Sequence, residues 1–286
     1  MSKIEFKKKL VIGSANFAQK YGADPIEIKN KQIKKILKIA KENNINFIDT
    51  AETYLKNKDI FKKIDKRFKF ITKIKPDFRW VSLDFCQKKL QTHFKKFNKN
   101  KIETLLFHDI NILLGKNGPI IFKNIKKFKK KYFKKIGISI YETKNLNYLI
   151  NNYNIDVVQC PFNILDKRIV NSGWLKKLRG KGIEIHARSI FLQGLLVNTS
   201  VYKKKYFKKW QKLFFKWFQD LEVNNISAID YCLSDLINYD FDRIIIGVNN
   251  YNDLNEIINF KKIKKNNKII NLKISDTKLI DPRKWN

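Results

Sequence analysis

Eight short apolar runs recur along the chain, and stretches with the spacing of amphipathic helices separate them. The runs lie at residues 10–13, 47–48, 70–74, 102–107, 135–140, 157–160, 183–187 and 244–247. Because they are apolar throughout, they predict strands buried on both faces of a parallel sheet. Eight strand–helix units in 286 residues fit a (β/α)8 TIM barrel, an α/β fold that typically takes roughly 250 residues. An open doubly wound sheet is the alternative, but no Gly-x-Gly-x-x-Gly motif follows the first run.

The segments between the runs predict helices that cover the sheet. At residues 31–44 lysines occupy one helical face, and apolar side chains mark the other: Ile33, Ile36, Leu37 and Ala40. Residues 81–97 repeat this spacing with Leu83, Cys86, Leu90, Phe94 and Phe97. The chain has only 5 Pro and 10 Gly and no linker rich in Pro, Gly or Ser, so we predict one domain over residues 1–286.

Ionisable side chains stand at the ends of three consecutive runs. Asp49 follows the second run, Lys73 lies near the end of the third, His108 follows the fourth, and Tyr54 comes five residues after Asp49. Each residue taken alone has a purely structural interpretation. Asp49 could cap the next turn, and Lys73 could be one of many surface lysines. His108 could be a hydrogen-bonded buried imidazole, and Tyr54 could be a core residue. All four together at one end of neighbouring strands predict a catalytic site, because the active site of a TIM barrel lies at the C-terminal ends of its strands.

Eight motifs follow one another in a fixed order over most of the chain. They are VIGSANFAQKYG (11–22), FIDTAETY (47–54), FITK (70–73), LLFHD (105–109), KIGIS (135–139), VVQCPFNILD (157–166), IHARSIFLQGLL (185–196) and RIIIGV (243–248). In these motifs the chain resembles the aldo-keto reductase family. The resemblance implies an NAD(P)H-dependent oxidoreductase that reduces an aldehyde or ketone to an alcohol. An interaction protein that keeps the fold and binds a cofactor with little turnover is the alternative.

The four ionisable residues suit this chemistry. The carbonyl oxygen becomes basic as hydride arrives, so an O–H donor lowers the barrier, and we predict Tyr54 as that donor. A phenol is a weak acid at pH 7, so its conjugate base needs the nearby ammonium of Lys73. Asp49 would keep Lys73 charged, and His108 would aim a hydrogen bond at the carbonyl. The resemblance implies the same four roles.

Cofactor contacts are implied by the resemblance alone. It implies that Ser139 and Gln159 hold the nicotinamide carboxamide and that Arg188 stacks on the ring, with Gly13 as a further cofactor-binding residue. Ser189, Phe191, Gln193 and Gly194 would cover the phosphates, and Gly247, Asn249, Asp253 and Glu256 would hold the adenosine end. NADP(H) is the first expectation. NAD(H) is the alternative, because Asp253 stands where relatives often place Arg or Gln against the 2′-phosphate.

Composition indicates few other partners. The formal net charge of +35 suggests nucleic acid or an acidic membrane surface as a partner. The lysines are spread over nearly every predicted helix and no nucleic-acid-binding motif is present, so neither a specific nucleic-acid partner nor a membrane partner is expected. Three cysteines without metal spacing, no apolar N-terminal segment and no run of membrane-spanning length predict a cytoplasmic protein without a metal. The expected substrate is a small carbonyl compound or sugar, and four aromatic residues are candidate substrate contacts: Phe17, Tyr21, Trp80 and Trp285. The oligomeric state stays open.

Overall fold

Eight parallel strands close into a barrel in chain order, and β8 pairs with β1 in the register Leu10↔Ile244 to Gly13↔Gly247. The structure is a computed structural model that describes residues 2–17, 22–23, 25, 28–54, 58–97, 102–263 and 276–285. The strands are β1 (Leu10–Gly13), β2 (Phe47–Asp49), β3 (Lys69–Ile74), β4 (Ile102–Phe107), β5 (Phe133–Ser139), β6 (Val157–Pro161), β7 (Glu184–Arg188) and β8 (Arg243–Gly247). The predicted (β/α)8 barrel is therefore confirmed, and the open doubly wound alternative is excluded.

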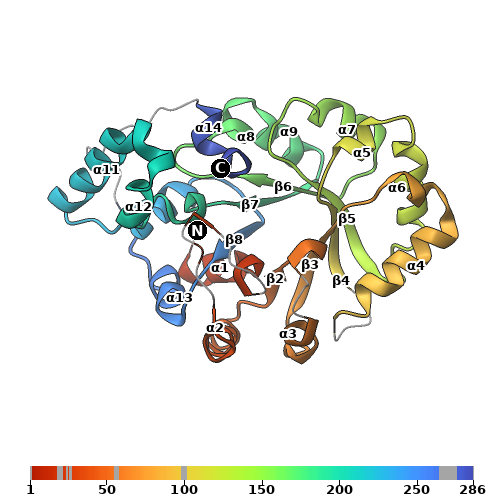
Figure 1. Ribbon diagram of the computed structural model, residues 1–286, viewed down its shortest axis with the longest axis horizontal. Helices are drawn as coiled ribbons and strands as arrows, with labels where there is room; N and C mark the ends of the chain where they lie inside the picture. The colour runs from red at the N-terminus through yellow and green to blue at the C-terminus, as the bar shows by residue number, and fades with distance from the viewer. Residues whose placement is uncertain are drawn as a thin grey trace.

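Helices surround this barrel (Figure 1), with α11 and α12 towards one end of the long axis and α4 towards the other. The α-helices are α1 (Lys3–Lys9), α2 (Asn30–Glu42), α3 (Lys58–Lys63), α4 (Leu83–Phe94), α5 (Asn111–Leu114), α6 (Gly118–Lys126), α7 (Leu146–Asn152), α8 (Arg168–Asn171), α9 (Trp174–Gly180), α10 (Thr199–Tyr202), α11 (Gln211–Val223), α12 (Ala228–Leu236), α13 (Tyr251–Ile258) and α14 (Thr277–Ile280). The 3₁₀ helices are η1 (Ala15–Phe17), η2 (Glu52–Tyr54), η3 (Phe78–Val81), η4 (Leu192–Gly194), η5 (Lys205–Trp210) and η6 (Pro282–Lys284).

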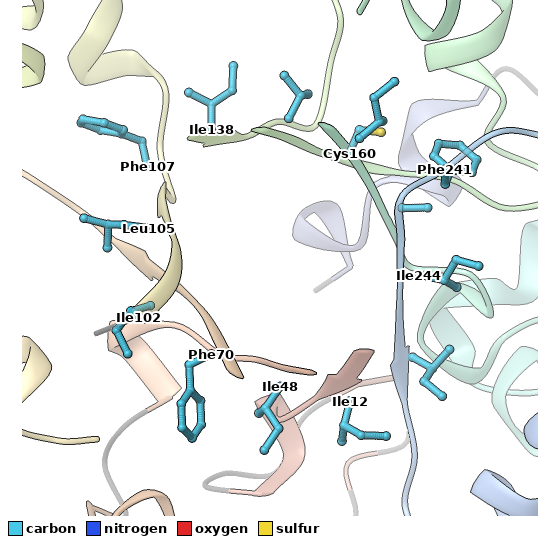
Figure 2. Close-up of a cluster of buried hydrophobic side chains, with 14 of the residues drawn as sticks. Ile12, Ile48, Phe70, Ile102, Leu105, Phe107, Ile138, Cys160, Phe241 and Ile244 are labelled. Atoms are coloured by element: carbon cyan, nitrogen blue, oxygen red, sulfur yellow. The ribbon is translucent and has the colours of Figure 1, made fainter. Parts of the chain in front are cut away.

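The two faces of each strand serve different layers, because successive side chains in a strand point to opposite faces. Figure 2 shows Ile12, Ile48, Phe70, Phe107 and Ile244 pointing outward from the ring of strands, where they belong to the large buried cluster between strands and helices. A separate small cluster fills the interior of the barrel: Val11, Phe47, Ile71, Leu106, Val157 and Ile245. Strands packed on both sides explain the apolar runs in the sequence.

The predicted helical faces mostly hold. Ile33, Ile36 and Ala40 of α2 are buried, and Leu37 is half-buried. In the second stretch Cys86, Leu90, Phe94 and Phe97 are buried, but the prediction for Leu83 is wrong, since that side chain is 37% exposed. Leu83 is the first residue of α4, directly after the Ser82 N-cap, where the helix has only begun to pack against the barrel.

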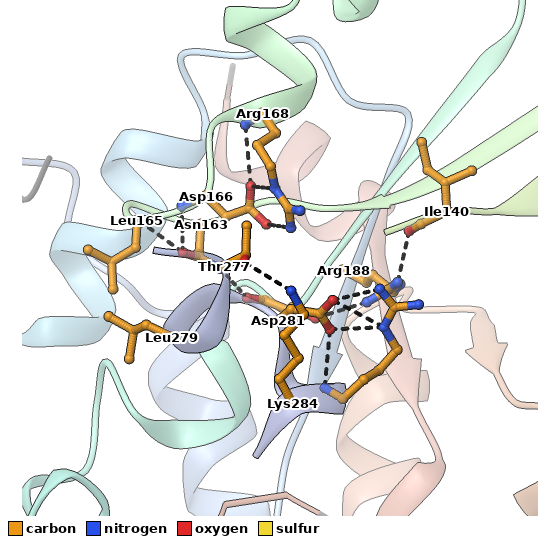
Figure 3. Close-up of polar contacts among 12 residues, drawn as sticks. Ile140, Asn163, Leu165, Asp166, Arg168, Arg188, Thr277, Leu279, Asp281 and Lys284 are labelled. Carbon is orange, nitrogen blue, oxygen red and sulfur yellow. Dashed lines mark hydrogen bonds and ion pairs between the residues drawn. The ribbon is translucent and has the colours of Figure 1, made fainter. Parts of the chain in front are cut away.

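The chain segment between β7 and β8 contributes most of a second buried cluster, which includes aromatic side chains of η5 and α11. The Trp217 indole donates a hydrogen bond to the carbonyl of Leu196 at 3.1 Å. Leu279 and Ile280 of α14 belong to this cluster. The Tyr206 hydroxyl oxygen lies 2.9 Å from the carbonyl oxygens of Lys278 and Lys284 and donates its one proton to either of them. These contacts fix the C-terminal segment near the ends of β5 and β7, where Figure 3 draws its residues beside Ile140 and Arg188.

No helix within the described ranges has the length and apolar character needed to cross a membrane. All three cysteines, Cys86, Cys160 and Cys232, are buried as free thiols.

Candidate active site

The layer directly above the barrel interior holds the ionisable residues found in the sequence. Six apolar side chains fill the barrel interior, and the residue two positions after each of them lies on the same face of its strand. These six residues are Gly13, Asp49, Lys73, His108, Gln159 and Gly247. On the two remaining strands Ser139 and Arg188 end β5 and β7. These positions surround the C-terminal mouth of the barrel, and a cavity of about 440 Å³ opens there. The period-two alternation of the strands therefore collects groups from eight strands in one place.

Asp49 and Lys73 form a buried ion pair at the base of this cavity. The Lys73 ammonium also donates to the carbonyl of Thr50 at 3.1 Å, and the Gln159 amide donates to the second Asp49 oxygen at 2.8 Å. Burial lowers the pKa of Lys73, the Asp49 carboxylate opposes that effect, and the charge of Arg188 adds to it. Lys73 is thus a desolvated ammonium that depends on Asp49 for its charge.

Tyr54 and His108 line the same cavity. Tyr54 ends the 3₁₀ turn η2, which begins three residues after the end of β2. Its ring lies edge-on to His108, with the ring centroids 6.3 Å apart and an interplanar angle of 77°. The backbone N–H of His108 donates to the Ile74 carbonyl at 2.8 Å, which fixes the residue beside the end of β3. Burial lowers the pKa of His108 to about 4, and the charges of Lys73 and Arg188 act in the same direction, so the imidazole is neutral at pH 7.

The closed eight-stranded barrel agrees with comparisons to known proteins. The family model described as "Aldo/keto reductase family" matches residues 9–272. The chain belongs to the aldo-keto reductase family. Membership makes it an oxidoreductase by family, and aldo-keto reductases generally use nicotinamide cofactors.

Solved structures of the family share the fold at low sequence identity. An aldo-keto reductase from Bacillus halodurans in its holo form has a TM-score of 0.71 and 14% identity, over 94% of this chain and 94% of that one. The glycerol dehydrogenase from Gluconobacter oxydans has a TM-score of 0.66 and 14% identity, over 91% of this chain and 89% of that one. A search of the curated proteins finds no match.

The residues expected to contact the cofactor line the cavity, with the exception of Gln159. They are Gly13, Ser139, Arg188, Ser189, Phe191, Gln193, Gly194, Gly247, Asn249, Asp253 and Glu256. Gln159 is fully buried behind Asp49, and its Oε1 atom is buried without a hydrogen-bond partner among the described residues. An amide N–H is the kind of donor that this oxygen lacks, so the donor set fits a nicotinamide carboxamide. The role of each residue stays a prediction.

The segment after β7 has an unusual backbone. Ser189, Leu192 and Gln193 have φ angles of 61°, 45° and 53°, and Gly194 has a φ angle of 92°. Non-glycine residues rarely adopt this left-handed region, and such strain gathers at ligand-binding segments. The Asn163 side-chain amide donates a hydrogen bond to the Ser189 carbonyl at 3.1 Å. Its Oδ1 atom accepts hydrogen bonds from the backbone N–H groups of Leu165 and Asp166, so Asn163 links the segment after β7 to the loop after β6.

Asp253, which also lines the cavity, acts as a helix cap at the start of α13. Its carboxylate accepts the backbone N–H groups of Asn249 at 2.8 Å and Asn250 at 3.3 Å, and the Asn250 side chain completes a capping box at the start of α13. This contact offsets part of the carboxylate charge near the expected adenosine end. Nearby, the Asn16 side chain donates to the Val248 carbonyl at 2.7 Å and ties the loop after β1 to the loop after β8.

Sequence reasoning missed Tyr141, one of the aromatic residues that line the cavity. It lies two residues after the end of β5, and the strand-end rule that found Asp49 would have found Tyr141 as well. Phe17, Trp80 and Trp285 do not line the cavity: Phe17 and Trp80 are core residues, and the Trp285 indole donates to the Leu279 carbonyl at 3.0 Å. Tyr21 lies outside the described residues. The described part of the chain has no group of three potential metal-ligating side chains.

Proposed function

We propose that this protein reduces an aldehyde or ketone to an alcohol with NAD(P)H, and that Tyr54 is the proton donor. The observation that supports this most directly is the convergence of Tyr54, His108 and the buried Asp49–Lys73 pair on one cavity. A bound nicotinamide cofactor supplies the hydride for such a reduction. The expected substrate is a small carbonyl compound or sugar that fits the same cavity.

The proposed proton transfer starts at the Tyr54 hydroxyl, which gives its proton to the carbonyl oxygen. The ammonium of Lys73 stabilises the phenolate left behind by electrostatic attraction, and Asp49 keeps that ammonium charged despite its burial. His108 is neutral at pH 7, so it can donate one ring N–H to the carbonyl oxygen without competing as an acid.

Cofactor binding is proposed for the polar residues at the strand ends. Ser139, Gln159 and Arg188 would hold the nicotinamide end. Gly13 also lines the cavity, and its lack of a side chain allows β1 to lie close to β8, since a Cβ atom there would lie 3.2 Å from the Ile246 carbonyl oxygen. The loop from Ser189 to Gly194 would cover the phosphates, and Asn249, Asp253 and Glu256 beside Gly247 would face the adenosine. NADP(H) remains the first choice, since the Asp253 carboxylate is already occupied by backbone N–H groups, and NAD(H) remains the alternative.

We further infer that residues 1–286 act as one domain in a reducing compartment such as the cytoplasm. Three buried thiols that form no disulfide support this compartment.

The test of the proposed function is Tyr54→Phe. The variant keeps the ring beside His108 but has no proton to donate, so carbonyl reduction should fall by at least ~10²-fold, the low end of what a positioned acid contributes. Cofactor affinity should stay nearly unchanged. Steady-state kinetics with 4-nitrobenzaldehyde and tryptophan quenching by NADPH and NADH measure the two quantities.

A variant that keeps more than half of the wild-type kcat would remove Tyr54 from this role. If wild-type protein binds NADPH or NADH saturably but reduces no aldehyde, the interaction-protein alternative gains instead. If it binds neither nucleotide, both functions are wrong.

A further inference from the structure

Arg188 has an unusual position for a charged residue. It ends β7, is half-buried, lines the cavity and points towards Ile140, as Figure 3 shows. Its guanidinium donates to the Ile140 carbonyl at 2.9 Å and to the Ser189 hydroxyl at 3.2 Å. A guanidinium carries five N–H donors, so these two neutral acceptors leave most of its hydrogen-bonding capacity unused.

Neighbouring cations, by contrast, are neutralised. Arg168 binds Asp166 through two hydrogen bonds at 2.8 and 2.6 Å, and Arg283 binds Asp281 at 2.9 and 2.6 Å. Within the cavity lining, Lys73 is paired with Asp49. Arg188 has no carboxylate partner anywhere in the described ranges, although partly buried charges in proteins are normally paired.

Tyr141 holds this guanidinium in place. The guanidinium carbon of Arg188 lies 4.0 Å from the centroid of the Tyr141 ring, and that of Arg283 lies 3.6 Å from the same ring. Stacking on an aromatic face fixes the plane of a guanidinium and leaves its edge, which carries the N–H donors, available. The buried Asp281 fixes Arg283 in turn, so a segment almost a hundred residues later in the chain supports the wall of the site.

We propose that the substrate is a carbonyl compound that also carries a carboxylate, and that this carboxylate pairs with Arg188 while the carbonyl reaches Tyr54. The inference rests on the proposed function. One unpaired guanidinium balances one negative charge, which favours a carboxylate over a phosphate monoester with roughly two charges at pH 7. The charge of Arg188 also acts on His108 and Lys73, which places the anion site within electrostatic range of the reacting groups.

The kinetic test compares 4-carboxybenzaldehyde with 4-formylbenzamide, two aldehydes of nearly equal shape that differ in charge. Wild-type kcat/KM should favour the carboxylate by at least ~10-fold, mainly through KM. Arg188→Met should abolish this preference, and the matched variant Arg188→Lys, which keeps the charge without the planar fork, should retain more of it than the Met variant does.

A binding test uses calorimetric titration of benzoate and benzamide into the protein saturated with NADP⁺. Benzoate should bind at least ~10-fold more tightly than benzamide to wild type, and this difference should vanish in Arg188→Met. The comparison of benzoate with benzamide on wild-type protein needs no variant. It therefore tests the inference even if the Arg188→Met protein folds poorly.

The outcomes separate the two proposals. Reduction of both aldehydes at equal kcat/KM overturns the carboxylate proposal and leaves the reductase function standing. If neither aldehyde is reduced, the reductase function fails, and equal binding of benzoate and benzamide then overturns the anion site as well. A loss of NADPH affinity in Arg188→Met with an unchanged aldehyde preference would assign Arg188 to the cofactor alone.

Discussion

At the scale of single residues, the site depends on the Asp49 carboxylate. One carboxylate oxygen accepts a hydrogen bond from the Lys73 ammonium, and the other accepts one from the Gln159 side-chain amide at 2.8 Å. Both oxygens of this buried carboxylate therefore have a hydrogen-bond donor. Burial lowers the pKa of Lys73, and the Asp49 carboxylate opposes that effect and so favours the charged ammonium. In the proposed mechanism Asp49 therefore favours the charge of Lys73 and, through Lys73, the acidity of Tyr54.

Asp49→Asn tests this dependence. The amide preserves shape and a hydrogen-bond acceptor, but it removes the negative charge that raises the pKa of Lys73, so burial should lower that pKa further. We expect kcat for carbonyl reduction to fall at least ~10-fold at pH 7 and the basic limb of the pH–rate profile to move to lower pH. A profile that superimposes on that of wild type would show that Lys73 does not act on Tyr54.

At the scale of elements, a buried histidine joins α4 to the barrel. His93 on α4 lies 3.0 Å through its Nε2 from the Thr72 hydroxyl on β3, and both side chains are buried. Burial lowers the pKa of His93 to about 3. Because the unfolded chain binds a proton at this residue near pH 6.5 and the folded one does not, the free energy of unfolding falls as the pH drops below about 6.5, until it levels off near the folded pKa.

His93→Gln is the variant that measures this effect. Glutamine can keep a hydrogen bond to Thr72 but does not titrate. Between about pH 7 and about pH 5, wild type should lose about 2 kcal/mol more unfolding free energy than the variant does, since the folded histidine stays neutral over that interval. Urea unfolding of both proteins at both pH values gives the difference. Equal losses would mean that His93 is protonated in the folded protein.

At the scale of the whole molecule, closure of the barrel requires close approach of strands that meet only in the tertiary structure. Gly137 on β5 pairs with Val157 on β6, and a Cβ atom at Gly137 would lie 2.1 Å from the Val157 carbonyl oxygen and 2.8 Å from a Leu106 methyl group. The backbone of β6 cannot move aside without breaking its own pairing with β7.

We therefore expect Gly137→Ala to lower the unfolding free energy by about 3 kcal/mol or more, in the range of severe overpacking. Gly180→Ala is the matched control, because the space around Gly180 at the end of α9 is open. That variant should be neutral or slightly more stable, as alanine favours a helix over glycine. Thermal and urea unfolding of the two variants decide the prediction, and equal stabilities would contradict it.

The sequence by itself determined the barrel and most of the ionisable residues at its C-terminal mouth. Apolar runs place the strands to within two residues, and alternation along a strand is a local property, so Asp49, Lys73 and His108 could be located at the ends of their strands. The sequence could not show that Leu83 is exposed, because helical periodicity does not say where a helix begins to pack against its neighbours.

Other features were decided by the tertiary structure. The backbone hydrogen bonds that Asp253 accepts depend on the conformation of the turn before α13. The guanidinium groups of Arg188 and Arg283 both contact the Tyr141 ring, although the two residues are almost a hundred positions apart. Among the described residues Arg188 has no carboxylate partner, whereas Asp166 and Asp281 pair with Arg168 and Arg283. Which carboxylate pairs with which arginine depends on the paths of the loops in three dimensions, and local sequence patterns do not encode those paths.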